Sequence, residues 1–283
     1  MAVSNPSSDL LAVSQITSLP DSFYYVPQFI SLEEEAYILQ KARYRTLFFP
    51  TQPVKLTHDA IPSNRWTHLS HRRLQAHPSV LSGKAGDVLP SAPLPPWLST
   101  FPPIAERFEK LGVFKNTKHG AANHCLVNEY NAGEGIMPHE DGGAYSPVVA
   151  TVSLGGTVCL DVYEKTEHDR TVDKAAAATS AVDGRDEEKN ARSKPRWRIL
   201  QPPRSLLVTM DPAYTFTIHG ISPIAIDEDL GPETVANWEL LEEDVRKSIM
   251  DNGGSSTRGL RISLTYREVL KVNKAVSAIF GKR

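Results

Sequence analysis

In the stretch "RGLRISLTYREV", residues 258–269, polar and apolar side chains alternate from Arg261 to Arg267. Successive residues of a β-strand point to opposite faces, so the pattern predicts a strand with one polar and one apolar face. The polar face would carry Arg261, Ser263, Thr265 and Arg267, and the apolar face Ile262, Leu264 and Tyr266. Two arginines on a strand inside a barrel indicate a bound anion, and a dicarboxylate suits the planar guanidinium fork. A solvent-facing strand is the alternative for this segment taken alone.

Further short runs rich in Val, Ile, Thr and Tyr precede this strand. They are "NHCLVNEY" (123–130), "PVVATVSL" (147–154), "GTVCLDVYE" (156–164), "SLLVTMD" (205–211) and "AYTFTIHGI" (213–221). Short strands bounded by Gly or Pro are typical of a sandwich or barrel. We therefore expect a mostly β fold with flanking helices (α+β) and a double-stranded β-helix, or jelly-roll, core.

Three segments predict helices. "SLEEEAYILQKAR" (31–43) opens with a capping box of Ser31 and Glu34, and "STFPPIAERFEKLG" (99–112) ends at Gly112. "ETVANWELLEEDVRKSIM" (233–250) indicates an inserted helix that is ended by the sequence Asn252-Gly253-Gly254.

The domain organisation follows from these elements. We expect a flexible N-terminus over 1–20, a single domain over 21–270 and a basic C-terminal tail over 271–283. Two insertions interrupt the domain, at 164–198 and 228–256. The first is charged and lacks apolar periodicity, which predicts mobility.

Bulk composition sets limits on location and partners. The net charge of −2 gives no global attraction to nucleic acid or membrane, so such binding would need a local patch. The two cysteines, Cys125 and Cys159, are too few for a zinc cage or a disulfide framework. No secretory signal or membrane-spanning run is evident. We expect a monomer in the cytoplasm and nucleus, without membrane contact.

The stretch "GEGIMPHEDGGAY" (133–145) suggests a metal site. In a strand, His139 and Asp141 share one face, and they supply two-thirds of the 2-His-1-carboxylate triad that holds non-haem Fe(II). His219, before Gly220 where the backbone could turn, is the candidate third ligand. The His-x-Asp pair alone is a weak signal, and His219 alone fits a hydrogen-bonded strand-end histidine equally well.

Taken together, the motifs resemble the AlkB family of Fe(II)- and 2-oxoglutarate-dependent dioxygenases, and in particular the subfamily of its sixth animal homologue. The similarity covers most of residues 20–270 and rests on "NRWTHLSHRRLQ", "LPPWL", "LVNEYNAGEGIMPHEDG", "HGI", "PRSLLV" and "RISLTYR". It implies that His139, Asp141 and His219 bind iron. It also implies 2-oxoglutarate contacts from Asn128, Tyr130, Arg261, Ser263 and Arg267, where Ser263 replaces an Asn of the family's archetype.

The resemblance further implies a reaction and a class of substrate. O2 and 2-oxoglutarate are consumed, succinate and CO2 are released, and a substrate C–H bond is hydroxylated; a hydroxylated N-methyl group then loses formaldehyde. In the archetype a lid before the β-core reads a nucleic-acid base, and the equivalent segment here is 55–77. Basic residues around an aromatic can bind phosphates and stack on bases, and the candidates are Lys55, Arg65, Trp66, Arg72 and Arg73, with Tyr145 at the mouth.

Three other interpretations remain. The segment 55–77 fits a solvated surface loop equally well. The same core could serve a protein hydroxylase or demethylase, or a nucleic-acid-binding protein with little or no demethylase activity. A cupin-type isomerase would need more histidines near the first pair and no arginine strand.

Overall fold

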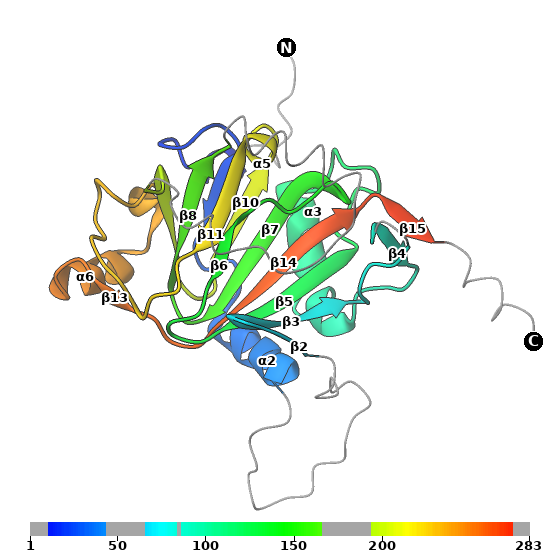
Figure 1. Cartoon of the computed structure of the whole chain (residues 1–283), viewed down its shortest axis with the longest axis horizontal. Helices are drawn as coiled ribbons and strands as arrows, with labels where there is room; N and C mark the ends of the chain where they lie inside the picture. The colour runs from blue at the N-terminus through cyan, green and yellow to red at the C-terminus, as the bar shows by residue number, and fades with distance from the viewer. Residues whose placement is uncertain (1–10, 44–65, 84–85, 166–193, 274–283) are drawn as a thin grey trace, which may run out of the picture.

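The computed structural model describes residues 11–43, 66–83, 86–165 and 194–273, and two antiparallel sheets form its core (Figure 1). The larger sheet has seven strands in the order β1 (Phe23–Val26), β10 (Leu206–Met210), β7 (Tyr145–Gly155), β14 (Arg261–Val269), β5 (His124–Tyr130), β3 (Arg72–His77) and β2 (Thr67–Leu69). The smaller sheet has the order β6 (Ile136–His139), β11 (Thr217–Ile221), β8 (Val158–Glu164) and β9 (Trp197–Gln201). The predicted mostly β jelly-roll with flanking helices is confirmed.

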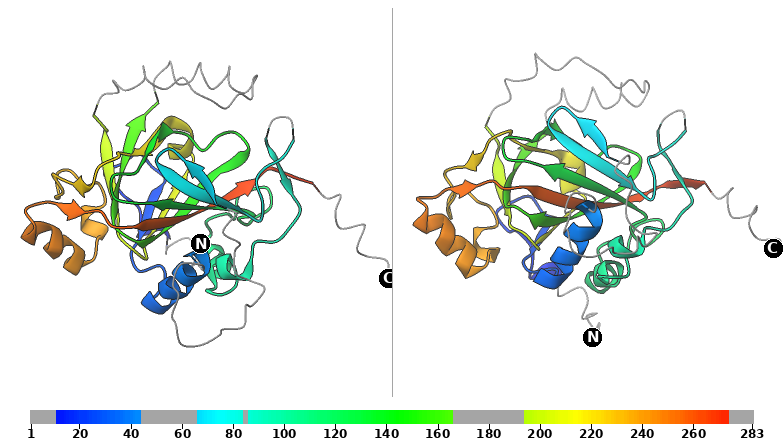
Figure 2. Two further views of the ribbon diagram at one scale, coloured as in Figure 1. Left: turned by 60° about the horizontal axis from the view of Figure 1, so that its bottom comes forward. Right: turned by 90° about the horizontal axis from the view of Figure 1, so that it is seen from below.

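Strand β14 lies in the middle of the larger sheet, with β7 on one side and β5 on the other. Its apolar residues Ile262, Leu264 and Tyr266 pack in one hydrophobic cluster with side chains from α2 (Leu32–Arg43) and α3 (Ile104–Leu111). Both helices therefore cover the outer face of this sheet, as Figure 2 shows. The polar residues of β14 point the other way, toward the smaller sheet.

Local sequence explains where both helices begin and where α3 ends. In α2 the Glu34 backbone N–H donates to Ser31 Oγ at 3.2 Å, and the Ser31 N–H donates to the Glu34 carboxylate at 2.8 Å, which is the expected capping box. Helix α3 begins at Ile104 and not at Ser99. Pro102 and Pro103 have no backbone N–H to donate, and each disfavours a helical conformation in the residue before it, so the helix cannot extend toward Ser99. It ends at Gly112, whose φ of 68° is left-handed.

Two other predicted elements are shorter than expected. The run 213–221 begins with a helical turn, α5 (Ala213–Phe216), and only its second half is the strand β11. The helix expected over 233–250 is divided into a 3₁₀ turn, η3 (Trp238–Leu240), and α6 (Glu243–Asp251). The break falls at Leu241, which is extended and buried in a second hydrophobic cluster against β8 and β9. Tertiary packing thus overrides helix propensity here.

The insertion after β11 also protects a sheet edge. Strand β9 is the last strand of the smaller sheet. The side chain of Asn237, 1% exposed, accepts a hydrogen bond from the Leu200 N–H at 2.9 Å and donates one to the Leu200 carbonyl at 2.8 Å. One amide thereby satisfies both backbone groups that an edge strand would leave unpaired.

Asn237→Ala is therefore expected to lower the free energy of unfolding by about 1–3 kcal/mol, because it leaves the buried Leu200 N–H and carbonyl without partners. Urea denaturation measures this. Asn252→Ala is the matched control, since that exposed amide donates to the Ser248 carbonyl of its own helix and has no other side-chain hydrogen bond within the described part of the chain. An equal effect of both substitutions would contradict the proposed edge protection.

The chain ends and insertions differ partly from expectation. Residues 11–20, expected to be flexible, pack against the fold: Ile16 is 1% exposed and its N–H donates to the Phe23 carbonyl. Residues 194–198, assigned to the first insertion, include the start of β9. Residues 271–273, assigned to the tail, form β15 (Lys271–Asn273), which pairs with β4 (Val88–Pro90). The remaining parts of these segments (1–10, 166–193 and 274–283) lie outside the described residues.

The short elements complete the fold. They are the 3₁₀ turn η2 (Pro96–Leu98) and the two-residue strands β12 (Ile226–Asp227) and β13 (Ser256–Thr257), which pair with each other. In the described part of the chain, none of the helices is long and apolar enough to span a bilayer.

Candidate active site

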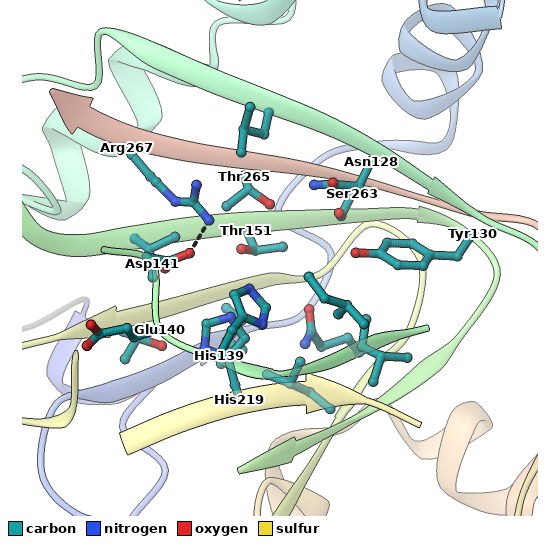
Figure 3. A pocket seen from close by; sticks show the side chains of 18 of the residues that line it. Asn128, Tyr130, His139, Glu140, Asp141, Thr151, His219, Ser263, Thr265 and Arg267 are labelled. Atoms are coloured by element: carbon teal, nitrogen blue, oxygen red, sulfur yellow. Dashed lines mark hydrogen bonds and ion pairs between the residues drawn. The ribbon is translucent and has the colours of Figure 1, made fainter. Parts of the chain in front are cut away.

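A cavity of about 230 Å³ lies between the two sheets and is lined by both. From the larger sheet its wall takes the polar face of β14 and matching residues of β5 and β7. From the smaller sheet it takes residues of β6 and β11. Figure 3 shows Arg267 and Asp141 at one end, Tyr130 at the other, and His139 and His219 on the opposite wall between them. The alternation in β14 thus becomes a polar cavity wall.

The three metal-ligand candidates meet in this cavity. His139 is the last residue of β6, and its register partner on β11 is His219, with 4.7 Å between ring centroids. Asp141 follows β6 by two residues, and ligand atoms from the three side chains all lie within 4.8 Å of one another. The sequence pattern therefore identified three residues that the fold brings together.

Glycine makes this approach of β6 and β11 possible. A Cβ at Gly220 would lie 2.9 Å from the Pro138 nitrogen, and one at Gly135 would lie 2.1 Å from the Ile221 carbonyl oxygen. We expected the backbone to turn at Gly220, after His219. It does not turn there, because β11 continues through Gly220 to Ile221. Its role is close backbone contact.

The protonation states suit a divalent cation. Burial, followed by the neighbouring His219, lowers the pKa of His139 to about 4, and burial lowers the pKa of His219. His139 Nδ1–H donates to the Met137 carbonyl at 2.8 Å, which leaves Nε2 with a free lone pair. Burial alone would raise the pKa of Asp141, but Arg267 and the two histidines hold it below its usual value. Two neutral imidazoles and one carboxylate are what Fe(II) requires.

Arg267 forms a buried ion pair with Asp141 (Figure 3). Its guanidinium carbon also lies 4.9 Å from the ring centroid of Tyr145. The Tyr145 ring in turn stacks on the His124 ring, with 6.0 Å between the ring centroids. Tyr145, expected at the substrate mouth, is therefore behind Arg267 and does not line the cavity. Its position indicates that it supports the arginine.

Arg261 is the second arginine of β14, and it is 4% exposed. It donates to Ser153 Oγ at 2.9 Å and to Gln201 Oε1 at 3.2 Å, while its buried Nε has no partner. Among the residues that the structure describes, no carboxylate pairs with it. Burial lowers its pKa to about 10. A buried cation without an anion is costly, so the site fits a ligand carboxylate.

The other predicted cosubstrate residues line the same cavity. Tyr130 and Ser263 are the register partners of Arg261 and Asn128, respectively, across the β5–β14 pair. Asn128, Tyr130 and Ser263 are all buried. The structure thus places amide, phenol and hydroxyl groups around the unpaired arginine, a donor set suited to a dicarboxylate such as 2-oxoglutarate.

The candidate substrate residues separate into three groups. Lys55 and Arg65 lie outside the described residues. Arg72 lines the cavity. Arg73 points to the opposite face, where it forms a 2.7 Å ion pair with Glu129 and lies 4.4 Å from the ring centroid of Trp66, which packs against the helix-side core. Adjacent strand residues face opposite ways, so of the two arginines in β3 Arg72 reaches the cavity and Arg73 does not.

Several cavity residues were missed from sequence. Gln201 lies at the end of β9, beside the segment interpreted as an insertion, and Tyr214 lies in the helical turn α5. Glu140 also lines the cavity and forms an ion pair with Lys165. Thr151, which lines the cavity, and Ser153, which accepts a hydrogen bond from Arg261, could have been found from the alternation of β7, which repeats the period-2 pattern of β14.

Comparison with known proteins agrees with this geometry. A family model described as the 2OG-Fe(II) oxygenase superfamily matches residues 22–267. A Danio rerio protein named "Probable RNA/DNA demethylase ALKBH6" is 33% identical over 268 residues, covering 95% of this chain and 94% of that protein. "Uncharacterized protein L905" of Acanthamoeba polyphaga mimivirus is 29% identical over 57% of this chain and 55% of its own.

A solved structure described as OsALKBH1 has a TM-score of 0.46 and 14% identity, covering 88% of this chain and 98% of its own. The family match and the zebrafish relative each cover most of the chain. The chain belongs to the 2OG-Fe(II) oxygenase superfamily and is an AlkB-type dioxygenase that uses Fe(II) and 2-oxoglutarate.

Proposed function

We propose that this dioxygenase removes N-methyl groups from methylated nucleic acid. The observation that carries the proposal is the 33% identity, over 95% of the chain, to a relative named a probable RNA/DNA demethylase.

Each part of the cavity has a role in this proposal. His139, Asp141 and His219 would hold the iron, and Asn128, Tyr130, Arg261 and Ser263 would hold 2-oxoglutarate. When bound, Fe(II) and 2-oxoglutarate use O2 to hydroxylate the methyl carbon, with release of succinate and CO2. The hydroxymethyl product then breaks its C–N bond, which leaves N–H on the base and releases formaldehyde.

The chain itself fixes the ligands and limits water. The Met137 carbonyl orients His139 through Nδ1, and Arg267 holds the carboxylate of Asp141. Apolar side chains make up much of the remaining wall; they are Phe23, Leu74, Leu126, Ile136, Val149, Leu160, Leu207 and Ile221. Such a wall strengthens the polar contacts at the reacting centre by lowering the local dielectric.

A turnover assay tests the proposal. Succinate and formaldehyde are measured for protein incubated with methylated single-stranded and double-stranded DNA and RNA, with methylated peptides, and without substrate. We expect formaldehyde in step with succinate for at least one nucleic acid and for none of the peptides. Asp141→Ala serves as the inactive control.

The same assay separates the alternatives. Succinate released in step with peptide hydroxylation or demethylation would replace the proposal with a protein substrate. Binding of nucleic acid with no formaldehyde from any of the methylated nucleic acids would instead support a nucleic-acid-binding protein that lacks demethylase activity.

A further inference from the structure

Three cavity residues form one row across the larger sheet. Arg261 on β14 is the register partner of Tyr130 on β5. On the next strand, Arg73 is the partner of Glu129, so Arg72 lies one residue further along, beside Tyr130. Arg72, Tyr130 and Arg261 thus occupy adjacent strands at the same end of the cavity, and all three line it. Neighbouring strands are about 4.8 Å apart, so the two arginine backbones are separated by roughly 10 Å.

Arg72 lacks the contacts that a structural arginine makes. Its Nε is buried and has no hydrogen-bond partner among the residues that the structure describes. Within the described residues, no carboxylate forms an ion pair with it. Arg73, its neighbour, is by contrast fully engaged by Glu129 and Trp66. A buried donor without an acceptor indicates a ligand atom at that position.

The positive charge of Arg72 lowers the pKa of the Tyr130 phenol. Burial raises the pKa of the Tyr130 phenol, and the cations that oppose this shift are, in decreasing order, Arg261, Arg72 and Arg267. The phenol therefore lies between two cations, neither of which has a carboxylate partner in the described part of the chain. An anion held beside the Tyr130 ring would be attracted from both sides.

We propose that Arg72 is a further cosubstrate-binding residue, which forms with Arg261 a two-arginine clamp on the distal carboxylate of 2-oxoglutarate. The metal-ligand candidates lie toward the Arg267 end, so a 2-oxoglutarate that binds at the metal would extend its far carboxylate toward this row (Figure 3). The two arginines come from different parts of the chain, β14 and the β2–β3 hairpin. Cosubstrate binding would thereby fix the hairpin strand against the core.

Ligand binding to the full-length protein with Mn(II) in place of iron tests the clamp. Two probes are compared by calorimetry and thermal shift: 2-oxoglutarate, and 2-oxopentanoate, which has the same length but no distal carboxylate. Arg72→Ala should weaken 2-oxoglutarate on the order of 10- to 100-fold, the range expected for lost charge-assisted hydrogen bonds. Binding of 2-oxopentanoate should be unchanged.

Arg73→Ala is the matched control, because it removes the same charge from the same strand on the opposite face. It should leave the affinity for both probes unchanged. Equal 2-oxoglutarate affinity of Arg72→Ala and wild type would overturn the clamp, as would equal weakening of both probes. Neither result bears on the proposed nucleic-acid substrate, which the formaldehyde assay decides independently.

Discussion

Asp141→Ala is expected to lower the affinity for Fe(II) by at least ~100-fold, because residues that merely orient a metal ligand already contribute 10- to 100-fold. Asp141 is the only carboxylate in the group with His139 and His219, so two neutral imidazoles would remain. Protein reconstituted anaerobically with Fe(II) and 2-oxoglutarate should lose both its bound iron and the absorption band that the bound pair gives. Iron analysis and absorption spectroscopy measure the two.

Two control variants separate loss of the ligand from loss of the ion pair. His139→Ala removes a candidate ligand but keeps the contact between Asp141 and Arg267, and it should also lose iron. Arg267→Gln keeps all three candidate ligands and removes only the group that orients Asp141, so it should weaken iron binding by about 10- to 100-fold at most, less than Asp141→Ala does. It should nevertheless lower the stability of the metal-free protein by about 3–5 kcal/mol, since Asp141 loses its buried counter-charge. Wild-type iron binding by both His139→Ala and Asp141→Ala would refute the triad.

The parts of the site that could be predicted from sequence are those carried by a local pattern. Strand β14 alternates polar and apolar residues from Arg261 to Arg267, so the sequence indicated which of these residues share a face. His139, Asp141 and His219 also line the cavity, and their residue types alone suggested metal binding. A buried strand with an uninterrupted pattern leaves little choice of register, because a shift by one residue would bury the wrong face.

Other parts depend on contacts between distant segments. Gln201 reaches Arg261 only because β9 pairs with β8 after an insertion, and nothing in residues 194–201 marks that pairing. Arg72 and Arg73 have the same chemistry, and only their strand register decides which of them enters the cavity. The helix predicted over 233–250 breaks at Leu241 because tertiary burial is more favourable there than a continuous helix.

Arg261→Ala is expected to weaken 2-oxoglutarate binding by roughly 2–5 kcal/mol while leaving the ligand-free protein as stable as wild type or slightly more stable. The first effect follows from loss of a charge-assisted contact in a buried site. The second follows because Arg261 has no carboxylate partner among the described residues, and its two acceptors can bond each other: Ser153 Oγ already donates to Gln201 Oε1 at 3.3 Å. Thermal unfolding with and without 2-oxoglutarate measures both.

Arg258, three residues earlier, provides the opposite control. It is also buried, but it forms a bidentate ion pair with Asp227, which is 1% exposed. Arg258→Ala would leave that carboxylate without a partner, so it should cost about 3–5 kcal/mol of stability and keep the stabilisation that 2-oxoglutarate provides. Arg261→Lys should restore binding poorly, because an ammonium group cannot reproduce the planar fork. Equal stabilisation by 2-oxoglutarate in wild type, Arg261→Ala and Arg261→Lys would mean that this arginine does not hold the cosubstrate. Arg258 and Arg261 would then differ only in how much each contributes to the stability of the fold, and the unpaired Nε of Arg261 would need another ligand.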